Sequence, residues 1–134
     1  MTDAPSAAEV VKKLYAAYDR HDHTAIQELY RHDATHDEIS QSKTKQGAAD
    51  IATGMQKLFA WLPDIHWKVK AMVGGEDGVV AVVYVMRATV PLKNGATETK
   101  PISLRGVQLV EVENGRIRHS EDYWDAATFQ RQLS

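Results

Sequence analysis

The stretch that decides the fold is residues 101–125, PISLRGVQLVEVENGRIRHSEDYWD. It contains two runs that are typical of β-strands, residues 102–112 and residues 116–124, separated by Glu113-Asn114-Gly115. A short Asn-Gly segment between two such runs is a strong signal for a β-hairpin. The sequence therefore predicts a long antiparallel hairpin in the last third of the chain.

The loop of this hairpin determines which way Asp122 points. If the loop has three residues, with a glycine in the φ > 0 position of a bulge, Val112 pairs with Arg116 and Asp122 lies opposite Gly106. The residues that then share a face with Asp122 are Gln108, Ser120 and Trp124.

A two-residue loop, Asn114-Gly115, would shift the register by one residue. Asp122 would then stand beside Arg105 and Val107, because side chains alternate between the two faces of a strand. We expect the three-residue loop, which places the acid among core-facing residues such as Leu104 and Val110. A carboxylate there must be paired, protonated or functional.

Length and composition are typical of one ordinary globular domain covering residues 1–134. Hydrophobic residues make up 43%, charged residues 25%, and the net charge is −2, so we expect no nucleic-acid partner. The chain has no cysteine, which excludes thiolate nucleophiles and Cys-ligated metals. There is no signal-peptide pattern and no long apolar run, so we expect no membrane partner and a cytoplasmic location.

Hydrophobic periodicity predicts the remaining elements in order. Strands that form a meander after several helices are typical of an α+β fold. The predicted elements are helices at 7–20, from about 24 to 30, 47–62 and 126–133, strands at 34–39, 65–73 and 79–90, a loop at 40–46, and turns at 74–78 and 91–96.

The two strands in the middle of the chain differ in pattern. In residues 65–73, Trp67, Val69, Ala71 and Val73 alternate with polar residues or methionine, so we expect those four on the buried face. Residues 79–90 are apolar on both faces for most of their length. Helices cover one of those faces, and we expect the other to bind a second copy of the chain in a homodimer.

Several of these segments together resemble a known family. The order of elements, the end of the third helix at Trp61-Leu62-Pro63-Asp64, and the tail segments 114–117 and 122–125 look like the SnoaL-like polyketide cyclase and limonene-epoxide hydrolase branch of the nuclear transport factor 2-like superfamily. The resemblance implies a curved, cone-shaped, mostly antiparallel sheet with the N-terminal helices on its concave face. It also implies a hydrophobic pocket that binds a small apolar molecule without a cofactor.

The resemblance carries over to individual residues only in part. Asp122 begins the tail motif and occupies the position of an acid/base group in the hydrolase branch. That branch also uses an arginine, for which Arg87 or Arg105 is available, and a second aspartate, which is missing between residues 79 and 90. The missing aspartate argues against epoxide hydrolysis.

Two further branches supply expectations. Glu38 occupies the position of the general base in the ketosteroid isomerase branch, but Leu14 stands where a tyrosine is expected, so steroid isomerisation is not supported. In the cyclase branch, an aspartate near the chain end pairs with a polar group on the preceding strand. Asp122 and Gln108 can fill those two places.

Each candidate has a structural interpretation beside the functional one. Burial of Asp122 would raise its pKa toward the range useful for proton transfer, whereas an ion pair with an arginine would make it structural. His36 and Glu38 share a strand face and could act together, or could simply be solvated on an edge strand. Arg87 is the expected partner of Asp122 or of a substrate carboxylate.

Aromatic and histidine residues complete the set of candidates. We expect Tyr15, Trp67, Tyr84 and Trp124 to line the substrate pocket, although aromatic residues at these spacings also fill cores. No histidine spacing matches a recognised ligand set, so we expect no metal. His66 and His119 are predicted to face solvent.

These inferences give one main hypothesis and one alternative. The main hypothesis is a cofactor-independent cyclase, isomerase, hydrolase or lyase in which Asp122 transfers a proton while Gln108, His36 and Glu38 orient or polarise the substrate. The alternative is a ligand-binding or dimerisation module of the same fold without catalysis.

Overall fold

A computed structural model describes residues 4–92 and 97–134. It confirms the α+β class. The elements are α1 (Ala7–Asp19), α2 (His23–Leu29), β1 (Tyr30–Glu38), the 3₁₀ turn η1 (Ile39–Gln41), β2 (Lys43–Gln46), α3 (Ala48–Trp61), β3 (His66–Gly74), β4 (Val79–Pro91), β5 (Thr99–Glu113), β6 (Arg116–Trp124) and α4 (Ala126–Leu133).

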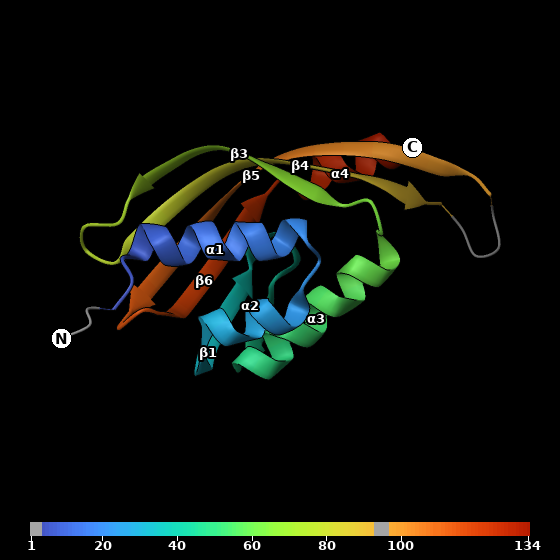
Figure 1. Ribbon diagram of the computed structural model, residues 1–134. Coiled ribbons are helices and arrows are strands. Elements are labelled where there is room, and N and C mark those ends of the chain that lie inside the picture. The colour runs from blue at the N-terminus through green and yellow to red at the C-terminus, as the bar shows by residue number, and fades with distance from the viewer. Residues whose placement is uncertain (1–3, 93–96) are drawn as a thin grey trace.

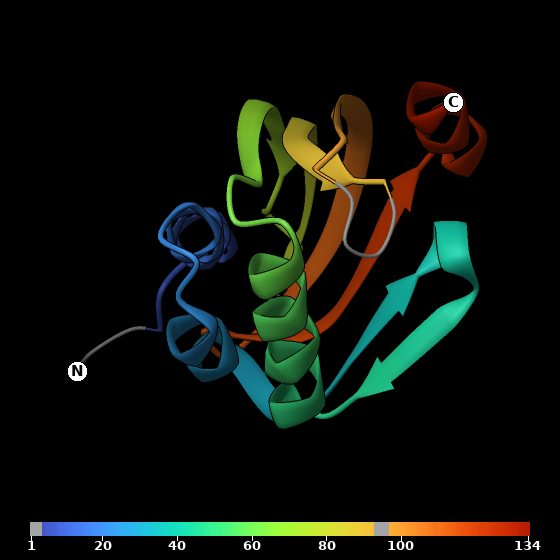
Figure 2. The ribbon, with the colours of Figure 1, turned by 90° about the vertical axis from the view of Figure 1, so that its right-hand side faces the viewer.

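The strands form one six-stranded sheet with the order β2-β1-β6-β5-β4-β3. All neighbouring strands are antiparallel except β1 and β6, which are parallel. The sheet curves around α1, α2 and α3, and α4 lies beyond the end of β6 (Figures 1 and 2). The cone-shaped, mostly antiparallel sheet with helices on its concave face is therefore confirmed.

Local sequence signals determine the helix ends. Ser6 and Glu9 form a capping box at the start of α1, and α1 ends at Asp19. The N-cap of α2 is Asp22, whose side chain accepts a hydrogen bond from the Ala25 amide at 3.0 Å. None of the helices among the described residues is long and apolar enough to cross a membrane.

The predicted loop at residues 40–46 is wrong, because this segment contains η1 and β2. β2 is an edge strand that pairs only with β1, through partners such as His36 with Lys45 and Glu38 with Lys43. An edge strand at the rim of a sheet can be entirely polar. Its sequence, KTKQ, therefore carries no apolar alternation by which it could be recognised.

β3 contains an irregularity that the alternation of its sequence does not show. The pairing with β4 shifts between Val69 and Ala71, as expected for a β-bulge. Beyond the bulge Met72 packs against the core, whereas Val73 is 60% exposed. The prediction that Ala71 and Val73 are buried is therefore wrong, while Trp67 and Val69 do pack against the core.

The terminal hairpin has the two-residue loop. Asn114 and Gly115 have φ angles of 52° and 80°, and Glu113 pairs with Arg116 across them. Two successive positive φ values are what a type I′ turn requires, and its twist matches that of the strands. The expected three-residue loop is therefore wrong.

A bulge in β6 nevertheless restores the predicted facing of Asp122. The register shifts near Arg118, so that Gln108 lies opposite Asp122, and Gly106 lies opposite Trp124 instead of opposite Asp122. Because the bulge adds one residue to β6, it reverses the change of face that the shorter loop would have produced. Asp122 therefore shares the inward face of β6 with Ser120 and Trp124, as predicted.

The core lies between the helices and the concave face of the sheet. The opposite face, which we call the outer face, is only partly covered among the described residues. The predicted turn at 91–96 falls mainly on residues 93–96, outside the described part of the chain. The described elements form one sheet and one main core cluster, and a single domain over residues 1–134 stays a prediction.

Candidate active site

A cavity of about 280 Å³ lies between α3 and the concave face of the sheet. Apolar side chains from both sides form most of its wall, so the cavity is suited to a compact apolar molecule. The apolar and aromatic lining residues include Ile51, Met55, Leu58 and Leu62 on the helix side, Trp67, Met86, Ile102 and Leu104 on the sheet, and Trp124 and Phe129 near α4.

Two carboxylates face this cavity from neighbouring strands. Glu38 on β1 is the direct partner of Asp122 on β6 in the parallel pairing, and both residues line the cavity. Strand neighbours in a sheet are about 5 Å apart, so their charges interact strongly where water is excluded. The fold therefore brings together the two acids that correspond to separate branches of the resemblance.

The pKa of Asp122 is raised to about 7, chiefly by burial and next by the negative charge of Glu38. A hydrogen bond from the Tyr84 hydroxyl to Asp122 Oδ1, at 2.6 Å, and the nearby His36 act in the opposite direction. No arginine pairs with Asp122 among the described residues. A carboxyl group with such a pKa can both accept and donate a proton near neutral pH.

A chain of hydrogen bonds fixes the second carboxylate. The Trp124 indole Nε1 donates to Glu38 Oε1 at 2.6 Å, and His36 Nε2 lies 3.4 Å from Glu38 Oε2. The other ring nitrogen of His36 is 2.7 Å from Ser120 Oγ, which also contacts the Tyr30 hydroxyl at 2.7 Å. Because Ser120 is fully buried, it holds His36 in place and is not an accessible nucleophile.

Gln108 lies behind Asp122 rather than in the cavity wall. It is 1% exposed and does not line the cavity. The Tyr15 hydroxyl donates to its Oε1 at 2.6 Å, and its Nε2 donates to the Tyr18 hydroxyl at 3.2 Å. Burial raises the pKa of both tyrosines well above the usual value, so both hydroxyls stay protonated. Of these three residues only Tyr18 borders the cavity.

The position of Tyr84 depends on a glycine in the next strand. Tyr84 on β4 pairs directly with Gly106 on β5, and a Cβ atom at position 106 would lie 2.2 Å from the Tyr84 hydroxyl. Only glycine leaves room for the ring to cross β5 and reach Asp122. No sequence pattern indicates this close approach.

Arg87 does not approach Asp122. It is exposed on β4 and is absent from the cavity lining, because it belongs to the set of alternating residues that includes Val83 and Val85. The expectation that it pairs with Asp122 is therefore wrong. This placement could not be predicted, because residues 79–90 are apolar on both faces and their alternation does not identify the inward side.

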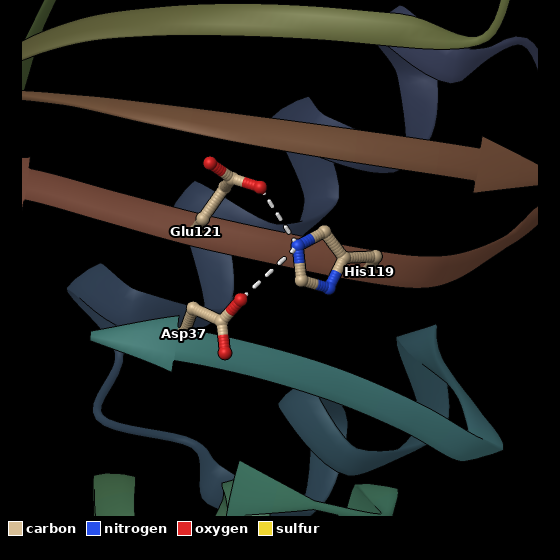
Figure 3. A group of neighbouring side chains, drawn as sticks. All are labelled: Asp37, His119 and Glu121. Atoms are coloured by element: carbon tan, nitrogen blue, oxygen red, sulfur yellow. Dashed lines mark hydrogen bonds and ion pairs between the residues drawn. The ribbon is translucent and has the colours of Figure 1, made fainter. Parts of the chain in front are cut away.

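His66 is exposed, as predicted. His119 was also predicted to face solvent, but it is half-buried among polar side chains. On the outer face, His119 Nε2 lies 2.9 Å from Glu121 Oε1 and 3.7 Å from Asp37 Oδ2 (Figure 3). Its Nδ1 is 2.7 Å from Thr35 Oγ1.

Asp37, His119 and Glu121 are also the one set of three potential metal ligands found among the described residues, with candidate atoms within 4.8 Å of one another. A divalent cation is the type of ion that one imidazole and two carboxylates could hold. An ion pair between histidine and two carboxylates explains the same arrangement without a metal. The set lies on the opposite face of the sheet from Asp122 and Glu38, and the expectation that the protein needs no metal stays a prediction.

Two lysines complete the rim of the cavity and were missed from the sequence. Lys43 and Lys45 alternate along β2 and both line the cavity, together with Gln41. Their spacing of two residues is the signal for a shared strand face. Two lysines in a polar segment do not by themselves distinguish an edge strand from a loop.

Comparison with known proteins supports the family suggested by the sequence. A sequence model of the SnoaL-like polyketide cyclase family matches residues 8–133. The search among curated proteins found no match.

Solved structures share the fold at low sequence identity. A candidate SnoaL-like polyketide cyclase from Shewanella denitrificans is 15% identical, with a TM-score of 0.84 over 95% of this chain and 96% of its own. IdmH, a candidate polyketide cyclase from Streptomyces antibioticus, is 21% identical, with a TM-score of 0.81 over 95% and 97%. A limonene-epoxide-hydrolase-like epoxide hydrolase from M. tuberculosis is 16% identical, with a TM-score of 0.76 over 95% and 88%.

The structural similarities establish the shared fold, and the family match extends over nearly the whole chain. The chain belongs to the SnoaL-like polyketide cyclase family.

Proposed function

We propose that this protein is a cofactor-independent enzyme that transfers protons within a compact, mostly apolar carbonyl compound, in a cyclisation or isomerisation reaction. The observation that carries the proposal is the pairing of Asp122 with Glu38 in the wall of an apolar cavity. A carboxyl group whose pKa lies near 7 is matched to proton transfer at neutral pH. The family match and the polyketide cyclases among the structural neighbours support this class of reaction.

In the proposed reaction, ionised Asp122 removes a proton from the carbon next to the substrate carbonyl. The electron pair of the broken C–H bond forms the enolate, which then attacks a second carbonyl carbon in a cyclisation or is reprotonated at another carbon in an isomerisation. Asp122 returns the proton to oxygen or to carbon in the last step. Glu38 raises the pKa of Asp122, His36 orients Glu38, and the Trp67 and Trp124 rings exclude water.

Gln108 and Tyr15 act as positioning residues in this proposal. They form a buried, fully hydrogen-bonded layer directly behind Asp122. Such a layer fixes the strand from which the acid projects. Neither side chain lines the cavity, so neither is assigned contact with the substrate.

Epoxide hydrolysis is less well supported than carbonyl chemistry. The described cavity lining contains no arginine and only two carboxylates, Asp122 and Glu38. The sequence resemblance led us to expect an arginine and a second aspartate in an epoxide hydrolase. Neither Arg87 nor Arg105 lines the cavity.

The test is hydrogen–deuterium exchange at the carbon next to the carbonyl of 2-tetralone, a two-ring ketone, followed by NMR in D₂O. We expect the protein to accelerate this exchange and the Asp122→Asn variant to lose roughly 100-fold or more of the acceleration. Asp50→Asn is the matched control, because Asp50 is exposed on α3 and does not line the cavity.

The alternative function is ligand binding without catalysis. It predicts that 2-tetralone binds while exchange proceeds no faster than in buffer. Equal exchange rates for the wild type and the Asp122→Asn variant would likewise contradict the proposed enzyme. Circular dichroism of both variants checks that the fold is retained.

We further propose that the protein forms a homodimer through the outer face. Val83, Val107 and Tyr123 are direct cross-strand neighbours there, and Val83 and Tyr123 are 36% and 40% exposed. Contiguous exposed apolar side chains on a sheet face are typical of protein interfaces. A second copy of the same chain presents the same surface and can pair with it about a two-fold axis.

A further inference from the structure

The inward-facing polar residues form two rows across the sheet. In the first row Gln108, Asp122, Glu38 and Lys43 are successive cross-strand partners on β5, β6, β1 and β2. In the second row Ser120 pairs with His36, and His36 pairs with Lys45. Each row therefore runs from the buried interior to a lysine at the rim.

The two lysines have no ion pair of their own. Across residues 4–92 and 97–134, neither ammonium group lies within 4.0 Å of a carboxylate oxygen. Glu38, which is nearest to Lys43 in the ladder, is instead held by Trp124 and His36. The positive charge at the rim is therefore available to a ligand.

Lys45 is held against the wall of the cavity by the shape of α3. A Cβ atom at position 54 would lie 2.6 Å from Lys45 Cε and 3.1 Å from its Nζ, so Gly54 provides the space in which this side chain lies. Both Gly54 and Lys45 line the cavity. The ammonium group of Lys45 thus lies in contact with α3 at the cavity.

The spacing of the strands gives the distance between Lys43 and Asp122 in the first row. β1 lies between β2 and β6, so Lys43 and Asp122 are two strand spacings apart, about 10 Å between their backbones. A molecule with two fused six-membered rings spans a distance of this order. Its anionic end would be attracted by the lysines and repelled by Asp122 and Glu38.

We propose that Lys43 and Lys45 bind an anionic oxygen substituent of the substrate, such as a carboxylate. The substrate is then a compact ring compound with a negative charge at one end and the reacting carbonyl at the other. The lysines determine its orientation as well as its affinity, because reversal would place like charges together. This inference rests on the proposed function, since it concerns the substrate of the same cavity.

The experiment compares two probes that share a ring system and differ in charge, 2-naphthoate and 2-naphthamide. Their dissociation constants are measured by isothermal titration calorimetry at pH 7.5 and low salt. We expect the wild type to bind 2-naphthoate roughly tenfold more tightly, the effect of two partly solvated charge pairs. Raising the salt concentration reduces this preference.

The variant Lys43→Gln/Lys45→Gln should bind both probes with similar affinity. Lys57→Gln is the matched control, because Lys57 is exposed on α3 outside the cavity lining, and it should keep the preference. Equal binding of the two probes by the wild type would overturn the inference. So would a preference that survives in the double variant, or a failure of the wild type to bind either probe.

The Asp122→Asn variant separates this inference from the proposed function. It should keep the preference for 2-naphthoate, because the lysines are intact, while it loses the deuterium exchange. A charge preference without any exchange in the wild type would contradict only the enzymatic proposal. Exchange without a charge preference would contradict only the role of the lysines.

Discussion

Asp122 is an acid whose surroundings oppose its ionisation. Burial and the charge of Glu38 raise its pKa to about 7, although Tyr84 and His36 partly offset this effect. Both protonation states are therefore populated at neutral pH. The same environment that favours proton transfer also makes the ionised acid a source of instability.

The stability of the protein should consequently depend on pH through Asp122. In the unfolded chain an aspartate loses its proton near pH 4, whereas in the folded protein Asp122 keeps it to about pH 7. The folded state thus binds more protons in this range, so the free energy of unfolding falls as pH rises from about 4 to about 7. Above that range the contribution is constant.

The Asp122→Asn variant should lack this contribution, because asparagine is neutral and still accepts the Tyr84 hydrogen bond. Relative to the wild type, it should gain on the order of a few kcal/mol between pH 5 and pH 8. Urea unfolding followed by tryptophan fluorescence measures the difference. Identical pH slopes for the two proteins would show that Asp122 ionises normally, and Asp50→Asn should follow the wild type.

The side-chain directions predicted from alternation are correct where the strand pairing is regular, and wrong beyond the bulge of β3, where Ala71 and Val73 are exposed. The direction of His36 and Glu38 follows from the period of two along β1. For Asp122 two differences from the prediction cancel: the hairpin loop is one residue shorter than expected, and the bulge adds one residue to β6. Arg87 was misplaced, because its strand is apolar on both sides. Tyr84 lines the cavity, and its hydrogen bond to Asp122 depends on the register that places it beside Gly106.

At the level of elements, the contact between β4 and β5 supports the site. The Gly106→Ala variant should displace the Tyr84 ring, because the added Cβ would lie 2.2 Å from the hydroxyl and 2.3 Å from Cζ. We expect a loss of about 1–3 kcal/mol in stability, as for other overpacked positions, and a reduced rate of 2-tetralone exchange.

A double-mutant cycle isolates this contact. In a Tyr84→Ala background the ring is absent, so Gly106→Ala should cost little. An equal cost of Gly106→Ala in both backgrounds would mean that the glycine serves the backbone and not the tyrosine. Urea unfolding of the four proteins provides the comparison.

The elements that sequence patterns do not predict are those without a characteristic residue pattern of their own. β2 is polar because it lies at an edge, and the bulges of β3 and β6 arise from pairing between strands rather than from any residue type at those positions. Such features depend on contacts distant in sequence. Helix ends and the Asn-Gly turn, by contrast, are encoded by neighbouring residues.

For the whole molecule, the proposed homodimer can be tested at the centre of the outer face. The Val83→Lys variant would place a positive charge on each copy at the expected interface, and we expect it to be monomeric. Size-exclusion chromatography with light scattering measures the mass. Ile39→Lys is the matched control, because Ile39 is 43% exposed outside the sheet face. A monomeric wild type would contradict the proposal.

The overall architecture was predictable because many weak signals agree. A capping box, the helical and strand periodicities of the apolar residues and an Asn-Gly turn each favour the same order of helices and strands. The identity of the substrate cannot be predicted from such local sequence signals. It depends on how side chains from β1, β2, β6 and α3 converge on one cavity, which only the assembled sheet defines.

The extra residue near Arg118 has a consequence for comparing this chain with its relatives. Six residues separate Gly115 from Asp122, and the bulge absorbs one of them, so Asp122 lies opposite Gln108 as an acid after five residues would in a regular strand. A relative that lacks this one residue and pairs regularly after the same turn would present its carboxylate to the same side, because its acid would also lie opposite the residue equivalent to Gln108. An alignment without a gap in this short span would therefore equate residues that point in opposite directions.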